Sequence, residues 1–401
     1  MFFENFIFIK IQVKSMKIKL ADRIKVIGTT KIEESLRIIE QHPKIISLGA
    51  GEPDFPAPPN VIKSAEKFLE KGYTHYSPLQ GRHELREELV KKLKKDNKIG
   101  VNQEQIVITC GSKEAILLSI LALVNPREEV VIPDPGYIAY RPIVELIGGV
   151  AKSLPLMERD GFEVHPDILK KIITRKTKLI IVNTPSNPTG TVLSRKTLEE
   201  IADIAVEKNL MIISDEAYEK LIYDNSKHVS IGSLNGMGDR VITIQTFSKT
   251  YAMCGFRVGY AVANENLIRE MKEFKLCTTL SAPTFSQLAA VEALRNSSNY
   301  VKMMLRDYDR RRKIIVKRLN EIPKISCFTP KGAFYAFPNV KSFKMSSDKF
   351  SDFLMRKAKV VVVPGNEFGK YGEGYIRLSY ATAYEKILKA LDRIEDSLRK
   401  L

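Results

Sequence analysis

The sequence predicts an α/β fold, with a mostly parallel central sheet in a large domain and a smaller α+β domain beside it. From Gln105 to Ala263, short apolar runs alternate with helical stretches, which is the pattern of strand–helix–strand units. Beyond Pro283, two long helical stretches, 284–296 and 298–321, precede short apolar strands. A chain of 401 residues, 44% of them hydrophobic, can bury one large core and one smaller one. We therefore expect two domains.

Short β-branched runs predict the individual strands. In the first region they are Ile106–Thr109, Val130–Ile132, Leu179–Val182, Met211–Ile213 and Val241–Gln245. In the second region they are Phe334–Phe337, Val360–Val363 and Tyr375–Ser379, followed by a terminal helix to Leu401. The parallel sheet is therefore expected to be built from the first group alone.

The first fifteen residues are expected to lie outside the fold. The apolar run Phe6–Ile9 is too short for the core of a signal peptide, and no small-residue cleavage site follows it. Met16 offers an alternative start. Residues 20–40 are expected to be helical, with a break at Thr29 and Thr30.

Composition narrows the class of protein. The four cysteines are far apart and form no C-x-x-C pair, which argues against a structural zinc site or a disulfide framework and for a reducing cytoplasm. No apolar run approaches the roughly 18 residues of a membrane span. The net charge of +17 raises the question of a nucleic-acid partner. Because the basic residues alternate with acidic ones along helical stretches, solvated helix faces explain the charge better.

The main chemical signal follows the predicted strand Val241–Gln245. Hydroxyls at Thr246 and Ser248, the amine of Lys249 and the guanidinium of Arg257 are crowded into one turn. A guanidinium can hold a phosphate through two parallel hydrogen bonds, and an amine in a dry site can attack a carbonyl. The turn therefore favours a phosphorylated carbonyl compound over the alternative, a basic surface turn.

This turn resembles the pyridoxal-phosphate lysine signature of class I/II aminotransferases, and further motifs extend the resemblance from about Leu20 to the C-terminus. The resemblance implies the pyridoxal-phosphate-dependent transferase fold of type I. It also implies that Lys249 forms the Schiff base with pyridoxal 5'-phosphate and that Arg257 binds the phosphate, with Ser248. Thr246 stands where the family usually has Gly or Ser; its hydroxyl can still bond phosphate.

Two motifs near the N-terminus carry the resemblance further. The run Ser47–Phe55 lacks the third glycine of a dinucleotide loop and is similar to the family's N-terminal motif, in which the residue at Gly51 lends a backbone N–H to the substrate carboxylate. The run Tyr73–Gly81 is similar to the segment whose tyrosine, here Tyr76, reaches the phosphate of the neighbouring subunit's cofactor. The resemblance therefore implies a homodimer. As an isolated residue, Tyr76 would more often be ordinary packing.

The glycine turn after the first predicted strand opens a helix at Gly111. Such a turn offers free N–H groups and a positive dipole end to an anion, although many strand–helix turns look alike. The resemblance implies phosphate contacts at Ser112 and Lys113. It also implies that Tyr137 stacks on the pyridine ring of the cofactor.

Three more motifs complete the expected site. In Asn183–Gly190, Asn187 is implied to bond the ring hydroxyl and the substrate carboxylate. Asp215 follows a predicted strand at the sheet edge where open α/β sheets bind ligands, and it can keep the pyridine nitrogen protonated; the alternative is a helix cap. Tyr218 is expected to donate to the ring hydroxyl. Arg377 lies inside an apolar strand, where an unpaired charge is costly, and is expected to bind the α-carboxylate.

The resemblance implies an extension at 1–15, a small domain of 16–50 and 284–401, and a large cofactor-binding domain of 51–283. We expect an aminotransferase that moves the amino group of an L-amino acid to 2-oxoglutarate. Aspartate is favoured as donor because Lys113 and the Thr29–Thr30 pair stand where some relatives bind a second carboxylate, and Lys113 would then bind substrate too. An aromatic donor is the alternative. A lyase or synthase, or a non-catalytic binding protein, on the same scaffold stays open.

Overall fold

The computed structural model describes residues 19–24, 44–399 and 401. The predicted extension 1–15, the alternative start at Met16 and the Thr29–Thr30 pair lie outside the described residues, as does most of the predicted helix 20–40. Within the described part, no helix is long and apolar enough to cross a membrane.

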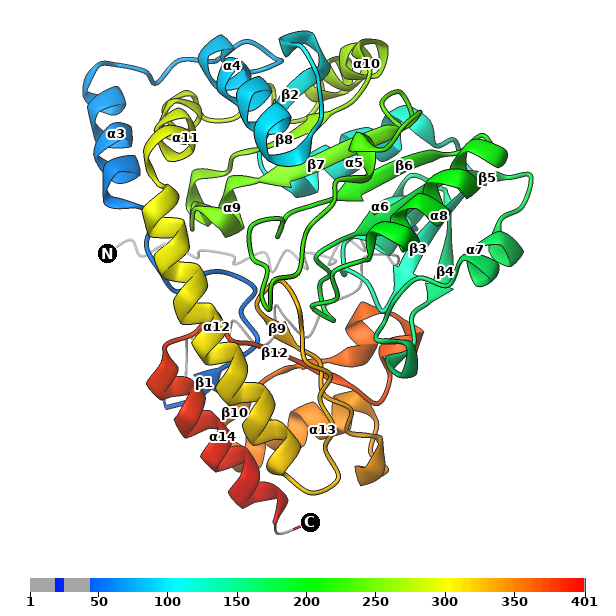
Figure 1. Ribbon diagram of the computed structural model, residues 1–401, viewed down its shortest axis with the longest axis vertical. Coiled ribbons are helices and arrows are strands. Elements are labelled where there is room, and N and C mark those ends of the chain that lie inside the picture. The colour runs from blue at the N-terminus through cyan, green and yellow to red at the C-terminus, as the bar shows by residue number, and fades with distance from the viewer. Residues whose placement is uncertain (1–18, 25–43, 400) are drawn as a thin grey trace, which may run out of the picture.

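A seven-stranded sheet is the centre of the upper part of the molecule in Figure 1. Its strand order is β2-β8-β7-β6-β5-β3-β4. Neighbours from β7 to β4 pair in parallel, whereas β8 is antiparallel to both of its neighbours. The bounds are β2 Ile106–Thr109, β3 Glu129–Asp134, β4 Val150–Pro155, β5 Thr177–Asn183, β6 Met211–Asp215, β7 Val241–Thr246 and β8 Gly259–Val262. The predicted α/β class with a mostly parallel sheet is confirmed.

Alternate residues of these strands face two separate apolar layers, because successive side chains of a strand point to opposite faces. Val131 packs with helices α7 and α8, whereas its neighbours Val130 and Ile132 pack with α5, α6 and α10. These helices span Ser112–Leu123 (α5), Tyr140–Leu146 (α6), Pro166–Ile172 (α7), Arg195–Glu207 (α8) and Glu265–Leu276 (α10). The sheet is therefore covered on both faces, as its near-continuous apolar strands require.

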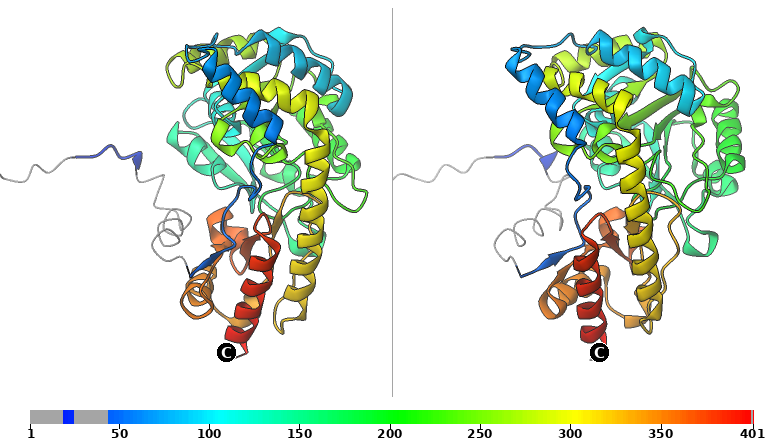
Figure 2. Two further views of the ribbon diagram at one scale, coloured as in Figure 1. Left: turned by 90° about the vertical axis from the view of Figure 1, so that its left-hand side faces the viewer. Right: turned by 60° about the vertical axis from the view of Figure 1, so that its left-hand side comes forward.

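A third group of helices packs at the β2–β8 end of the sheet, where Ile106, Ile108 and Tyr260 join its apolar cluster. Both α3 and α4 contact α11. Their bounds are Pro59–Glu70 (α3), His83–Lys92 (α4) and Thr284–Asn296 (α11). From there α12, Ser298–Glu321, runs down the molecule into its lower part (Figures 1 and 2).

The lower part combines short strands with helices around its own apolar cluster. Strand β1 (Ile46–Ser47) pairs in parallel with β10 (Val360–Val361), so segments more than 300 residues apart lie side by side. Strand β12 (Ile376–Ser379) pairs antiparallel with both β9 (Tyr335–Ala336) and β11 (Val363–Pro364). Two helices, α13 (Ser347–Phe353) and α14 (Tyr384–Leu398), complete it. The predicted strand Val360–Val363 is thus two short strands in different sheets.

The segments that contain most of the predicted site residues meet at one edge of the large sheet. Strands β2, β3, β5, β6 and β7 all point the same way, so the residues that follow them meet at a single edge. At this edge β6 ends in Asp215 and β7 leads directly into the short helix α9, Phe247–Thr250. In the lower part the segment after β1 runs alongside β12, where the Ser379 N–H donates to the Leu48 carbonyl oxygen, and Gly51 and Arg377 line the same cavity.

Candidate active site

A cavity of about 390 Å³ opens at this edge and is lined by residues from both parts of the molecule. The large sheet and its turns contribute Ser112, Lys113, Tyr137, Asn187, Asp215 and Tyr218. The turn after β7 contributes Ser248, Lys249 and Arg257, and the lower strands contribute Gly51 and Arg377. Eleven residues that the sequence motifs single out therefore share one cavity, although up to 326 positions separate them.

Lys249 lies on α9 and faces the N-terminal motif across the cavity. The Thr246 hydroxyl caps this helix by accepting a hydrogen bond from the Ser248 backbone N–H at 3.2 Å. Lys249 Nζ donates to the Gly51 carbonyl oxygen at 2.6 Å. The amine is therefore held at the junction of the two parts of the molecule, with its side chain only partly buried.

Arg257 and the start of α5 form a cradle of donors at one end of the cavity. Arg257 has a left-handed backbone with φ of 56°, and its guanidinium donates to the Cys254 and Cys110 carbonyl oxygens, each at 2.8 Å. Gly111 has φ of 93°, and a Cβ there would lie 2.7 Å from Arg257 Nη2. Only glycine lets the start of α5 and the guanidinium approach so closely. The free N–H groups beginning at Ser112 and this cation suit a phosphate.

Asp215 is 4% exposed and meets two donors. Tyr140 Oη donates to Asp215 Oδ2 at 2.6 Å, and the Ala217 backbone N–H donates to Oδ1 at 3.2 Å. Burial raises the pKa of Asp215 from its ordinary 3.8 to about 6, and the Tyr140 hydrogen bond opposes that rise. A cation placed beside this carboxylate would restore its ionisation, which is what a pyridinium nitrogen offers.

Arg377 is a buried cation without a carboxylate partner among the described residues. It is 3% exposed, and Nη1 donates to Asn187 Oδ1 at 3.1 Å while Nη2 donates to the Gly49 carbonyl oxygen at 2.7 Å. Its Nε is buried and has no hydrogen-bond partner in the described part of the chain. Neutral acceptors do not balance a buried charge, so the site is prepared for an anion such as a carboxylate.

Two tyrosines of the site have no role in the sequence interpretation. Tyr140 bonds Asp215, and Tyr335 lines the cavity with its hydroxyl 2.8 Å from that of Tyr218. Tyr140 lies one helical turn after Tyr137, but spacing alone does not show that it faces β6. Tyr335 belongs to the run Pro330–Tyr335, which resembles a family motif, yet nothing local marks its hydroxyl as part of the site.

Two predicted cofactor contacts lie away from the cavity wall. Thr246 is buried, and its hydroxyl bonds Ser248 and the Val258 carbonyl oxygen. Its contact with phosphate stays a prediction. Tyr76 is 83% exposed, which is unusual for so large a ring. Its expected contact is with another subunit, which a single chain does not contain.

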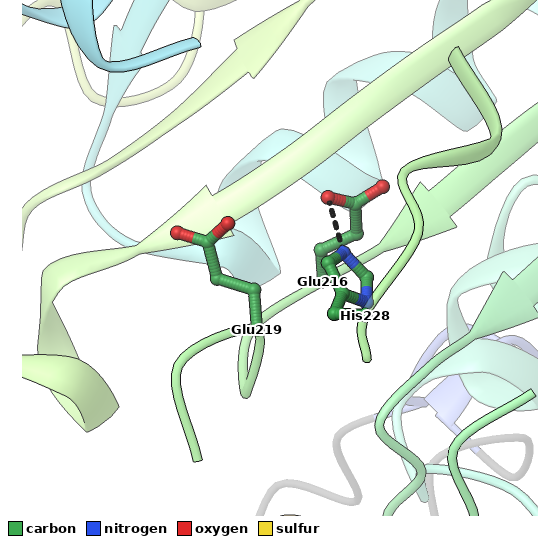
Figure 3. Close-up of side chains that lie close together, drawn as sticks. All are labelled: Glu216, Glu219 and His228. Carbon is green, nitrogen blue, oxygen red and sulfur yellow. Dashed lines mark hydrogen bonds and ion pairs between the residues drawn. The ribbon is translucent and has the colours of Figure 1, made fainter. Parts of the chain in front are cut away.

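A second polar cluster follows Asp215 and is drawn in Figure 3. One ligand atom each of Glu216, Glu219 and His228 lies within 4.8 Å of the others, a spacing compatible with a metal. These carboxylates already have partners: His228 Nε2 lies 3.0 Å from Glu216 Oε2, the Lys92 ammonium pairs with Glu219, and Asn97 donates to Glu219 at 2.7 Å. The Lys92 ammonium already supplies a positive charge to Glu219. We therefore assign no metal to this cluster.

Comparison with known proteins decides the family. The family model "Aminotransferase class I and II" matches residues 43–394. The chain belongs to the class I and II aminotransferases. It is 46% identical over 384 residues to the aspartate aminotransferase of Pyrococcus abyssi, a match that covers 95% of this chain and 98% of that protein. It is equally 46% identical over 384 residues, with the same coverage, to aromatic-amino-acid aminotransferase 2 of Thermococcus litoralis.

A solved structure of the aspartate aminotransferase from Thermus thermophilus with maleate superimposes with a TM-score of 0.90 at 33% identity. The match covers 95% of this chain and all of that one. Class I and II aminotransferases use pyridoxal 5'-phosphate, and this aminotransferase is therefore an enzyme that depends on that cofactor. The donor cradle at Arg257 and the buried carboxylate of Asp215 fit the phosphate and the pyridine nitrogen of the group.

Proposed function

We propose that this aminotransferase transfers the amino group of L-aspartate to 2-oxoglutarate, and that the cavity residues act as the sequence motifs predict. Arg257, Ser112 and Ser248 would hold the phosphate, with Thr246 behind them. Asp215 would face the pyridine nitrogen. Asn187 and Tyr218 would bond the ring hydroxyl, and Tyr137 would pack against the ring.

The bound cofactor supplies an electron sink that makes the substrate α-carbon acidic. Lys249 Nζ would hold the cofactor before the amino acid arrives. Once released as a free amine, Nζ would accept the proton from the substrate α-carbon and pass it on to the cofactor. Arg377, Asn187 and the Gly51 backbone orient the α-carboxylate. The 2.6 Å contact of Lys249 with Gly51 supports this assignment, because it places the amine beside the segment expected to hold the substrate.

The number of positively charged side chains at the cavity supports aspartate as the amino donor. Among the described residues four line the cavity: Lys113, Lys249, Arg257 and Arg377. Three have duties with the cofactor or the α-carboxylate, which leaves Lys113. It is exposed and has no ion pair among the described residues. A second carboxylate without a partner would cost several kcal/mol in a closed site, so a spare cation favours a dicarboxylic substrate. Lys113 is also expected to lie near the phosphate.

Kinetics with Lys113→Ala test this choice. Loss of a charged contact should lower kcat/KM for aspartate and glutamate about a hundredfold, equivalent to about 3 kcal/mol. The values for phenylalanine and tyrosine should change far less. Lys196→Ala, on the exposed face of α8, is the matched control and should leave all four donors unchanged. Equal losses for all four donors with Lys113→Ala would refute the assignment.

An aromatic donor is the second candidate, because the Thermococcus litoralis relative carries that name at the same identity as the Pyrococcus abyssi relative. A panel of donors against several 2-oxo acids separates the two. Stoichiometric use of 2-oxoglutarate would also exclude a lyase or synthase reaction.

We also propose that the chain forms a homodimer in which Tyr76 reaches the cofactor phosphate of the neighbouring subunit. Its other binding partners would be small molecules and not nucleic acids. Its location would be cytoplasmic. The exposure of Tyr76 supports the dimer. The domain division proposed is 51–283 for the large domain, and 16–50 with 284–401 for the small one. Sedimentation should give twice the mass of one chain, and Tyr76→Phe should weaken cofactor binding without splitting the dimer.

A further inference from the structure

Tyr335 stands where several parts of the site meet. It is 1% exposed and lies at the start of β9. Its hydroxyl is 2.8 Å from that of Tyr218 and 3.5 Å from the Gly51 carbonyl oxygen. The guanidinium carbon of Arg377 lies 4.4 Å from the centroid of its ring. One side chain therefore contacts three groups that the proposed function uses.

The hydroxyl contacts have a preferred direction, because each phenol has a single hydrogen to donate. The Gly51 carbonyl oxygen lies 3.5 Å from the Tyr335 hydroxyl, at the limit of a hydrogen bond. Either phenol could donate across the 2.8 Å between the Tyr335 and Tyr218 oxygens. We infer that Tyr335 donates to Tyr218, because this contact is much shorter than the one to Gly51. The hydrogen of Tyr218 is then free to point into the cavity.

The ring of Tyr335 acts on Arg377 instead. The guanidinium lies against this ring and against the ring of Phe368, at 4.4 and 5.0 Å from the two centroids. A cation held over an aromatic face keeps a fixed plane. With Nη1 and Nη2 directed at Asn187 and Gly49, that plane determines where the buried, unpartnered Nε points.

We propose that Tyr335 is a positioning residue with two separable duties: its hydroxyl directs the hydrogen of Tyr218 into the cavity, and its ring fixes the plane of Arg377 for the substrate carboxylate. The proposal rests on the proposed function, since it takes Tyr218 to meet the cofactor and Arg377 to meet the α-carboxylate.

Two substitutions separate the duties. Tyr335→Phe keeps the ring and removes the hydroxyl. In the holoenzyme it should shift the pH midpoint of the bound cofactor's absorbance change by half a unit or more, and it should leave carboxylate binding within about twofold of wild type. Tyr335→Leu removes both, so it should shift the midpoint similarly and also raise the Kd for a bound carboxylate about tenfold.

The matched controls are Tyr308→Phe and Tyr308→Leu. Tyr308 is fully buried in the same apolar cluster, and its hydroxyl has no hydrogen-bond partner within the described ranges. Its ring packs against Phe334, which in turn contacts Tyr335 and Tyr218, so these variants change the packing one ring away from the two site tyrosines. Both should leave the absorbance midpoint and the carboxylate Kd unchanged, even if their stability falls.

Calorimetric titration of each holoenzyme with maleate and with 3-phenylpropionate completes the experiment. Maleate reports on dicarboxylate binding, and 3-phenylpropionate reports on Arg377 with an aromatic ligand. If wild type binds only 3-phenylpropionate, the choice of aspartate fails while Tyr335 is still tested. An unchanged midpoint in Tyr335→Phe overturns the hydroxyl duty. If Tyr335→Leu binds the carboxylate ligand of wild type with unchanged affinity, the proposed role of the ring in positioning Arg377 is wrong.

Discussion

Asp215→Asn should stabilise the cofactor-free protein at alkaline pH, although it removes the carboxylate that we propose to face the pyridine nitrogen of the cofactor. The carboxyl group is 4% exposed, and none of the described residues forms a salt bridge with it. Burial raises its pKa to about 6 from an ordinary value of 3.8. The folded protein therefore keeps the Asp215 proton up to a higher pH than the unfolded chain does.

The sign and size of the effect follow from this difference. Between pH 3.8 and pH 6 the folded state binds more protons, so the free energy of unfolding falls as pH rises through that window. A rise of about two units in the pKa of Asp215 on folding lowers the free energy of unfolding by about 3 kcal/mol at pH 8 and by about 1 kcal/mol at pH 4.5. Asparagine does not titrate. Its single carbonyl oxygen can accept only one of the two hydrogen bonds that Tyr140 and the Ala217 N–H donate to Asp215, and that loss does not depend on pH. The increase in the free energy of unfolding caused by Asp215→Asn should therefore be about 2 kcal/mol larger at pH 8 than at pH 4.5.

Urea unfolding of the cofactor-free wild type and variant at the two pH values measures this. Asp203→Asn, which changes an exposed carboxylate on α8, is the control and should show no such pH dependence. With pyridoxal 5'-phosphate added, wild type should be the more stable of the two, because the variant lacks the charge proposed to face the pyridine nitrogen and should bind the cofactor more weakly. A gain from Asp215→Asn that is the same at pH 4.5 and pH 8 would refute the reasoning.

Two further changes test other parts of the site. Lys249→Ala should abolish the absorbance shift on adding an amino donor, while Lys196→Ala should not; full turnover by Lys249→Ala would rule out its assigned role. Gly111→Ala should raise the Kd for pyridoxal 5'-phosphate at least tenfold, because the new Cβ would lie 2.7 Å from Arg257 Nη2 on a backbone with φ of 93°. Gly100→Ala, where a Cβ meets nothing within 4 Å, should bind the cofactor as wild type does.

Local patterns were sufficient for most of the elements. Helices α11 and α12 begin and end at the predicted residues, and the five predicted strands of the large sheet are present. Such segments are determined by their own periodicity and by the residues at their ends. The strands β4 and β8 were not assigned individually, because Val150–Pro155 is only partly buried and Gly259–Val262 follows directly on the turn at Arg257.

The lower part was predicted less well. The run Val360–Val363 reads as one strand, but β10 pairs with β1 while β11 pairs with β12. A sequence of four valines offers the same edge to any neighbour, so its pairing depends on which segments the rest of the chain brings alongside. Only the tertiary structure supplies that information.

The sequence by itself determined the family and the candidate side chains of the site. Lys249, Asp215 and Arg377 stand in motifs whose residue types and spacing are specific to one family, and that family is confirmed. Those motifs do not determine how segments that are distant in the sequence pack against each other. The contacts of Tyr140 with Asp215 and of Tyr335 with Tyr218 span 75 and 117 positions. They exist because sheet pairing and core packing bring the segments together, and no local preference of a tyrosine encodes its distant partner.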